Sequence, residues 1–382
     1  MNRTIPRARM DFGAFLSPLH PLGEDPALTL WRDLELAEWL DTLGFAELWV
    51  GEHHSAGWGT VSSPELFIAT AAERTRHIRF GTGVVSLPYH HPYMVASRAV
   101  QLDQLTRGRV TLGVGAGSIP VDMHLLGIDP ADTRRRTAES LEVILQLLKG
   151  EKPVTRRTDW FELNDARLQL RPCTTGGLPL AVSSATSPFG MRLAGQHGIT
   201  PISFGVPPRP GSRIGDLAGQ WRHAEEAAAE HGRTIDRADW RVSLAVHVSE
   251  SRSQALDEIV DGWTRYRNEY WSMLGAPPVH SAAEARKALE EAIETRSVIV
   301  GSPEDCVQAI DDVQDVAGGF GRLLVTVMDW ARREQMKRSF ELLARFVRPH
   351  FTGALDGVRD SAAWATELAQ RFAGETVPDP RP

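Results

Sequence analysis

Short runs of β-branched and aromatic residues alternate with longer amphipathic segments along most of the chain. The first such run covers residues 10–18, and the second, ELWVGEH, covers 47–53. Between them, residues 29–45 carry apolar side chains at helical spacing and end at a glycine. The same order of strand and helix recurs up to residue 347. The predicted strands are 10–18, 47–53, 78–88, 109–118, 178–184, 199–204, 240–250 and 321–330.

These strands are nearly continuous in apolar residues, which indicates a parallel sheet that is buried on both faces. Eight strands that are each followed by helical sequence predict an α/β fold, an eight-stranded parallel (β/α)8 TIM barrel with insertions. A doubly wound open sheet is the alternative. In a barrel, the site would lie at the C-terminal ends of the strands.

The predicted domain organisation has three parts. Residues 1–9 form a flexible N-terminal arm, 10–350 a single barrel domain, and 351–382 a C-terminal extension and tail. The barrel carries insertions at about 151–177, 205–215 and 276–300, and a long helical region is predicted over 252–296. The proline- and glycine-rich segment 205–215 is long enough to be a lid.

Composition narrows the function to small-molecule chemistry. The formal net charge of −7 gives no broad attraction for nucleic acid or anionic membranes. No apolar run is long enough to cross a membrane. The two cysteines, Cys173 and Cys306, are far apart, which indicates neither a disulfide framework nor a thiolate zinc site and fits a reducing cytoplasm.

The chemistry-bearing residues follow the predicted strands, and the clearest group is EHH at 52–54. Successive side chains on a strand point to opposite sides, so we expect Glu52 and His54 to face one way and His53 the other. Taken together, the residues after the strands are rich in imidazole, glycine and hydroxyl groups and poor in carboxylates. That set suits a flat, anionic cofactor better than a bare metal ion.

Two other interpretations of these motifs are weaker. The run GVGAGS at 113–118 resembles a dinucleotide-binding fingerprint, but Ser118 stands where the third glycine is needed. His90 and His91, together with His53 and His54, suggest a metal cluster. However, the side chains of adjacent histidines on a strand point in opposite directions. We therefore predict no metal site.

A phosphate seat is predicted where a helix begins after the fifth strand. Ser187 and Pro188 have the pattern of an N-cap and first-turn pair, with Ser184 just before them. A helix N-terminus attracts anions. The run of arginines at 134–136 lies near the start of another helix, where its own dipole does not favour cations, so a bound anion would explain at least one of them; we expect Arg135 to be solvated.

Several stretches together carry a family resemblance. The chain resembles the bacterial-luciferase-like flavin-dependent oxidoreductases over most of its length, and is most similar to the limonene-monooxygenase-like branch. The residues that carry the resemblance are WVGEHHSAGWG (49–59), IRFGTGVVSLPYHHP (78–92), LDQLTRGRVTLGVGAG (102–117), LGIDPADTRRR (126–136), SPFGMRLAGQHG (187–198) and VGSPEDC (300–306).

The resemblance implies a barrel that binds reduced FMN, which reacts with O2 at C4a to give a peroxyflavin. His53 falls on the family's catalytic histidine, Gly83 and Val84 on a non-proline cis peptide against the flavin, and Gly115 on a position that faces the ring. Arg134 and Ser187 match positions that hold the phosphate. One departure is Ala116, where the luciferases have an arginine.

The function predicted from the resemblance is a two-component FMNH2-dependent monooxygenase that oxygenates a small, hydrophobic organic substrate. No fold for NAD(P)H is evident, so a partner flavin reductase is expected to supply FMNH2, and a homodimer is expected. Alternatives are an F420-dependent hydride-transfer oxidoreductase, a non-catalytic flavin-binding protein and a metal-dependent hydrolase. The predicted substrate-pocket residues are Phe15, Trp58, His91, Ile119 and Trp330.

Overall fold

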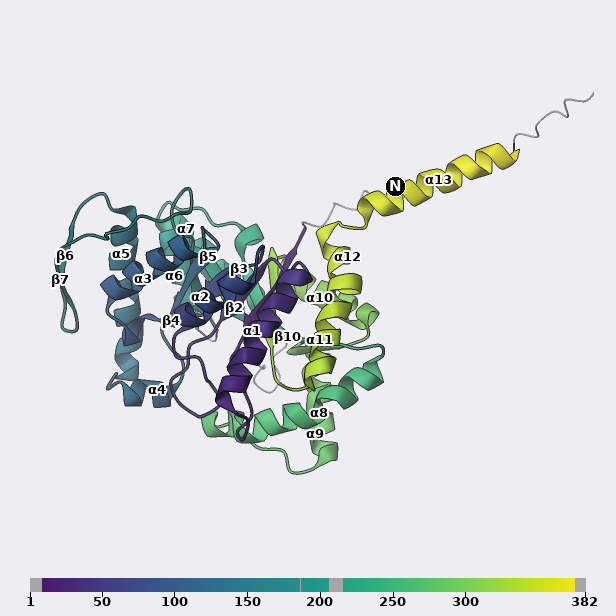
Figure 1. The fold of residues 1–382 in the computed structure, drawn as a ribbon, viewed down its shortest axis with the longest axis horizontal. Helices are drawn as coiled ribbons and strands as arrows, with labels where there is room; N and C mark the ends of the chain where they lie inside the picture. Colours follow the sequence, from purple (N-terminus) through teal and green to yellow (C-terminus); the bar gives the residue numbers. More distant parts are fainter. Residues whose placement is uncertain (1–8, 186, 206–215, 375–382) are drawn as a thin grey trace, which may run out of the picture.

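The computed structural model describes residues 9–185, 187–205 and 216–374 (Figure 1). Most of the predicted N-terminal arm (1–9) and of the predicted lid (205–215) lies outside the described residues, as does the tail from 375.

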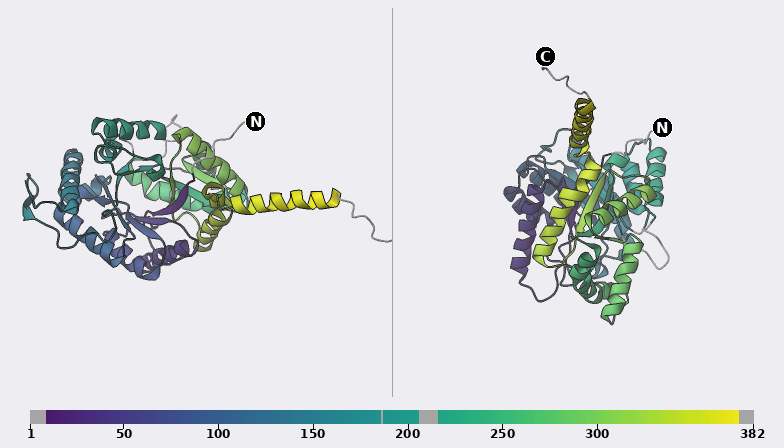
Figure 2. Two further views of the ribbon diagram at one scale, coloured as in Figure 1. Left: turned by 90° about the horizontal axis from the view of Figure 1, so that it is seen from above. Right: turned by 90° about the vertical axis from the view of Figure 1, so that its right-hand side faces the viewer.

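Eight parallel strands close into a ring in the order β1, β2, β3, β5, β8, β9, β10, β12 and back to β1, which confirms the predicted barrel. Figure 2 shows this ring from above, with the helices outside it. The barrel strands are β1 Asp11–Leu16, β2 Glu47–Val50, β3 Arg79–Thr82, β5 Val110–Gly115, β8 Leu180–Ser184, β9 Thr200–Phe204, β10 Arg241–Val248 and β12 Arg322–Val327. The others are β4 Val85–Ser86, β6 Val154–Arg157, β7 Glu162–Ala166 and β11 Val298–Gly301.

Helices connect the strands and cover the outside of the barrel, apart from the C-terminal helix, which projects away from it (Figure 1). They are α1 Pro26–Thr42, α2 Pro64–Arg74, α3 Pro92–Leu105, α4 Pro120–Leu125, α5 Thr133–Lys149, α6 Phe189–His197, α7 Leu217–Glu230, α8 Arg252–Glu269, α9 Ala282–Glu294, α10 Pro303–Ala317, α11 Arg333–Leu342, α12 Arg348–Thr352 and α13 Asp356–Gly374. None of the helices in the described part of the chain combines the length and the apolar character needed to span a membrane.

A tryptophan fills the inside of the barrel. Trp49 of β2 is fully buried and packs with Phe15, Ala181 and Leu324. Glycines on the neighbouring strands make room for its ring: a Cβ added at Gly81 would lie 2.3 Å from Trp49 Cε3. The interior is thus a packed core, and the site must lie above it, at the strand ends.

The N-terminal end of the barrel is closed by an ion-pair cluster. Buried Glu47 accepts hydrogen bonds from Arg241 at 2.7 and 2.9 Å and a longer one from Arg322 at 3.3 Å. Burial alone would raise the pKa of the Glu47 carboxyl, but the two arginines outweigh it and lower the pKa. This end therefore contributes to stability and leaves the opposite end for chemistry.

The region predicted as one long helix over 252–296 is divided. Helix α8 ends at Glu269, and α9 begins only at Ala282. After α9, Val298–Gly301 form the strand β11. This strand pairs with residues 245–248 of β10, beside the barrel. Its short β-branched run was missed because it lies between two helices and is completely buried by them.

Candidate active site

His53 follows β2 at the C-terminal end of the barrel. Its backbone N–H donates to the Val61 carbonyl at 2.9 Å, which folds the loop 53–61 back on itself. Gly59 is required for this turn, because a Cβ there would lie 2.4 Å from His53 Cβ. Burial lowers the pKa of the imidazole, and the nearby carboxylates Asp122 and Glu52 offset this only in part. His53 is thus neutral at physiological pH, with one N–H donor and one acceptor nitrogen.

Glu52 and His54 lie on the same side of the chain, as the alternation predicts. Buried Glu52 Oε1 accepts from His54 Nε2 at 2.9 Å and from His90 Nε2 at 2.6 Å, and its Oε2 accepts from the Ser86 N–H at 2.6 Å. Burial opposes ionisation of Glu52, but these hydrogen bonds outweigh it and lower the pKa to about 2. The carboxylate therefore ties the end of β2 to the β4 segment.

The low pKa of Glu52 predicts an acid-labile contribution to stability. A carboxyl whose pKa falls on folding stabilises the protein above its unfolded value, near 4.5, and loses this effect as the pH falls toward 2. Between pH 5 and pH 3 we expect the free energy of unfolding to fall about 2 kcal/mol more in the wild type than in Glu52→Gln. Denaturant unfolding at a series of pH values measures this; parallel curves would contradict it. Glu47, whose pKa is also lowered, affects the unfolding free energy of both proteins equally, so its contribution cancels when the two are compared.

The same three side chains have the composition of a metal site. Ligand atoms of Glu52, His54 and His90 lie within 4.8 Å of one another, and two imidazoles with a carboxylate suit a transition metal. Yet Nε2 of His54 and Nε2 of His90 each already hydrogen-bond to the Glu52 carboxylate. The cluster is therefore satisfied without an ion.

We accordingly expect removal of metal ions to leave the activity unchanged. Dialysis against a chelator, followed by assay in metal-free buffer, should give the turnover of the untreated protein, because the hydrogen bonds to Glu52 hold the site. A loss of activity that Zn²⁺ or Fe²⁺ restores would identify the cluster as a metal centre.

Gly115 of β5 lies close to Val84, the residue just before β4. The peptide bond between Gly83 and Val84 is cis, and Ser86 of β4 pairs with Gly115 of β5. Gly115 must lack a side chain here: an added Cβ would lie 2.5 Å from Ser183 Oγ and 2.7 Å from Val84 Cγ2. The Ser183 and Val84 side chains thus pack directly against the Gly115 backbone.

Arg134 brings the starts of two helices together. It lies at the beginning of α5, and its guanidinium carbon is 6.0 Å from the ring of Phe189, the first residue of α6. Arg134 is exposed and makes no ion pair with the described residues. Arg135 differs: it pairs with the carboxylates of Asp132, Glu139 and Asp159. Arg134 alone of these two is available to an anion.

The start of α6 differs by one residue from the prediction. Pro188, not Ser187, is the cap residue, and no side chain of the described residues, which leave out 186, caps the helix. Ser184 Oγ instead donates to the Ser187 carbonyl at 3.1 Å, which shapes the turn. The free N–H groups of α6, the Ser187 hydroxyl and Arg134 together fit a phosphate group.

The predicted pocket residues do not all come together. Trp58 and Trp330 both pack on Tyr266 of α8, with ring centres 5.8 and 5.9 Å away. Their indole N–H groups are buried and have no partner among the described residues. Ile119 is buried just before α4, while Phe15 belongs to the barrel interior, where it packs against Phe204.

His91, like Phe15, lies apart from Trp58 and Trp330. It is exposed at the start of α3, and its ring lies 6.0 Å from that of Phe161 in the 151–177 excursion. Its neighbour His90 makes the contact with Glu52 instead. The sequence could not separate the two, because adjacent residues diverge whichever one faces inward.

Sequence reasoning missed three polar residues that contact the loop 53–61. Asp122 of α4 is buried and accepts a short hydrogen bond from the Ser55 hydroxyl. Tyr89 has a buried hydroxyl without a partner among the described residues, lies across Gly117 and has a pKa raised by burial. Tyr270 stacks on Tyr266, with ring centres 5.3 Å apart. Tyr89 and Asp122 follow β4 and β5 in the sequence, whereas Tyr270 directly follows α8, so the sequence carries no signal that the three share.

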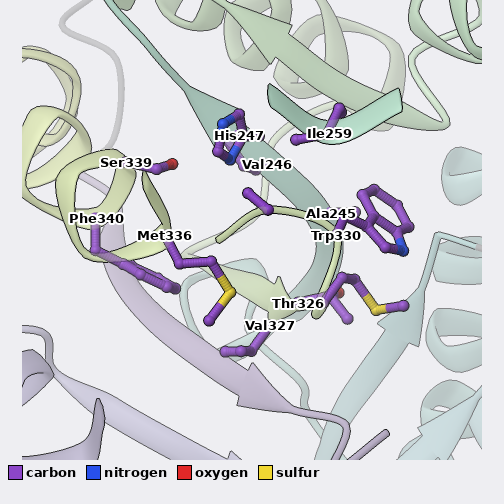
Figure 3. Close-up of a pocket in the computed structure, with 12 residues that line it drawn as sticks. Ala245, Val246, His247, Ile259, Thr326, Val327, Trp330, Met336, Ser339 and Phe340 are labelled. Carbon is purple, nitrogen blue, oxygen red and sulfur yellow. The ribbon is translucent and has the colours of Figure 1, made fainter. Parts of the chain in front are cut away.

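The small cavity shown in Figure 3 lies elsewhere. It is lined by residues of β10, β12, α8 and α11, among them His247, Ile259 and Met336, and its volume of about 20 Å³ is that of about one water molecule. Of the predicted site residues it includes only Trp330. We therefore assign it no part in binding.

Comparison with known proteins places this geometry in a family. The model of the luciferase-like monooxygenase family matches residues 10–318. The chain is 76% identical to 4-hydroxyprotoasukamycin monooxygenase of Streptomyces nodosus subsp. asukaensis over 362 residues, which are 95% of this chain and 98% of the relative. It is 44% identical to limonene 1,2-monooxygenase of Rhodococcus erythropolis, over 91% of this chain and 88% of the relative.

A solved structure agrees with both. The oxygenating constituent of 3,6-diketocamphane monooxygenase from Pseudomonas putida, a type II Baeyer–Villiger monooxygenase in complex with FMN, superposes with a TM-score of 0.75 at 27% identity. The match covers 89% of this chain and 98% of that one. These relatives are monooxygenases, which favours oxygenation over F420-dependent hydride transfer. The chain belongs to the luciferase-like monooxygenase family.

Proposed function

We propose that this monooxygenase uses reduced FMN and O2, with the FMN phosphate at Arg134 and the start of α6 and the ring against Gly83, Val84 and Gly115. The observation that carries the proposal is the exposed Arg134 beside the N-terminus of α6: within the described residues, Arg134 has no ion-pair partner and no side chain caps α6. A cation and free N–H groups at one point are what a phosphate needs. The position of the ring follows the family resemblance, which implies that Gly83, Val84 and Gly115 lie against the flavin.

Reduced FMN, when bound, supplies the electrons that activate O2. His53 is then placed to hold or donate one proton at an imidazole nitrogen, since its lowered pKa keeps it neutral. Glu52 acts on the other side of the chain, where it fixes His54 and His90. The buried aromatic cluster of Trp58, Tyr266 and Tyr270 would exclude water from the site.

The substrate proposed is a small organic molecule that is largely apolar. The aromatic surface around Tyr266 provides apolar contact. The indole N–H groups of Trp58 and Trp330 are buried donors without partners among the described residues, and a polar atom of the substrate could accept from them. The names of the relatives, limonene 1,2-monooxygenase and 4-hydroxyprotoasukamycin monooxygenase, are consistent with an apolar and a hydroxylated substrate respectively.

A separate flavin reductase is proposed as the source of reduced FMN. One structural relative is an oxygenating constituent of a larger system. We also propose that the protein works as a homodimer in the cytoplasm.

The test is a turnover assay under ¹⁸O2 with reduced FMN supplied chemically or by an unrelated reductase. Each product molecule is expected to gain one ¹⁸O atom. Reduced F420 should not replace FMN. Oxygen-independent turnover with reduced F420 would overturn the proposal, and product without ¹⁸O would overturn the oxygenation.

A further inference from the structure

The hydroxyl of Tyr89 is a buried hydrogen-bond donor that has no partner among the described residues. Tyr89 is the last residue of the short helix η1 Leu87–Tyr89, which follows β4 at the C-terminal end of the barrel. A buried hydroxyl without a partner costs free energy, because it has given up its hydrogen bonds to water. In a binding site, a donor of this kind is expected to be satisfied by the ligand.

The end of β5 makes room for this hydroxyl without bonding to it. A Cβ added at Gly117 would lie 2.3 Å from Tyr89 Oη, so a residue with a side chain would displace the hydroxyl. Gly117 also has a φ of +75°, a conformation that favours glycine. Because Gly117 lies two residues beyond the end of β5, the hydroxyl is at the mouth of the barrel, where the site is expected.

The chemistry around the hydroxyl selects a neutral oxygen as its partner. Burial raises the pKa of Tyr89, and the charges of Asp122 and Glu52 raise it further, so the hydroxyl stays protonated and acts as a donor. The same two charges would repel a carboxylate or phosphate oxygen. The acceptor that fits is therefore the oxygen of a carbonyl or a hydroxyl group.

The loop 53–61 connects Tyr89 with the aromatic surface proposed for the substrate. The ring of His54 lies 6.0 Å from that of Tyr89, measured between ring centres. Further along the same loop, the ring of Trp58 lies 5.9 Å from that of Tyr270. Tyr89 is thus beside the start of the loop, and the aromatic cluster is beside its end.

Asp122 is close to both ends of this surface. Ser55 of the loop donates a hydrogen bond to it. Burial raises the pKa of Tyr270, and the charge of Asp122 raises it further, as it does for Tyr89. The flavin phosphate is proposed elsewhere, at the start of α6, which follows β8. The oxygen that accepts from Tyr89 is therefore expected on the substrate.

We infer, on the basis of the proposed function, that the Tyr89 hydroxyl donates a hydrogen bond to a carbonyl or hydroxyl oxygen of the substrate. The substrate is then an apolar molecule that carries such an oxygen, and Tyr89 is a specificity-determining residue. A pure hydrocarbon of the same shape would leave the buried donor unpaired, and for that reason it would bind less well.

The experiment compares two probes in full-length, flavin-free protein by calorimetric titration. The probes are limonene and carvone, which has the limonene skeleton with one ring carbonyl. Each protein gives a ratio of the limonene Kd to the carvone Kd, and the different hydration of the probes cancels when ratios are compared. We expect the ratio to be roughly 5–100-fold lower in Tyr89→Phe than in the wild type.

Tyr93→Phe is the matched control, because the Tyr93 hydroxyl already donates to the Arg167 carbonyl at 3.1 Å. Its ratio should equal that of the wild type. Thermal unfolding shows whether the Tyr89 hydroxyl has a structural role instead. Tyr89→Phe should unfold at a temperature no lower than the wild type, since the group removed has no partner among the described residues.

An unchanged ratio in Tyr89→Phe would overturn the inference, as would a wild type that binds neither probe or a variant that unfolds at a lower temperature. The Kd for reduced FMN should be the same in Tyr89→Phe and wild type; weaker FMN binding would assign the hydroxyl to the flavin. The probe titrations contain no flavin. A failed ¹⁸O2 assay together with the expected change in ratio would thus overturn the proposed function alone.

Discussion

Replacement of His53 with alanine is expected to lower kcat/KM by about 10²–10⁴-fold, the range for loss of a positioned acid–base group. The imidazole is neutral because burial lowers its pKa, so it can give up or accept one proton without a large cost. FMN affinity should change little, because the proposed phosphate contacts are at Arg134 and α6. Steady-state kinetics and an anaerobic titration with reduced FMN measure the two quantities separately.

His91→Ala is the matched control, since His91 is exposed and lies outside the Glu52 network. It should retain nearly full activity. The rate of flavin oxidation after mixing with oxygenated buffer gives a further readout. If His53→Ala kept wild-type turnover, the protein would be a flavin-binding member of the family in which this histidine has no chemical role.

The barrel could be predicted because apolar residues recur along the sequence at regular spacings. Each strand is an apolar run and each helix has its own repeat, so eight strands and the end that carries the chemistry could be inferred. Strand β11 could not, because Val298–Gly301 lies between α9 and α10 in a region whose pattern is otherwise helical. It is defined by long-range pairing with β10.

The site was predicted unevenly for a similar reason. Alternation along one strand correctly placed Glu52 with His54, since both lie within three residues. Contacts between distant segments had no such signal. Asp122, for example, comes close to His53 only because α4 folds over the end of β2, and the hydrogen bond from Ser55 spans 67 positions.

Arg134→Ala is expected to weaken the binding of reduced FMN by about 10–100-fold, which corresponds to the roughly 1.5–3 kcal/mol of hydrogen bonds to a charged group. The effect should be specific to the phosphate. Riboflavin lacks that group, so its affinity should be the same in wild type and variant. A flavin titration under anaerobic conditions at two salt concentrations measures both ligands.

Arg135→Ala is the control, because the neighbouring arginine is already engaged by three carboxylates. It should bind FMN as the wild type does. This chain has Ala116 where the luciferases carry an arginine, so fewer cations are available to bind the phosphate. The loss of Arg134 should therefore lower the FMN affinity more than it would in a luciferase. Equal losses of FMN and riboflavin affinity in Arg134→Ala would mean that the side chain supports the fold of α5 and α6, and the phosphate would have to be placed elsewhere.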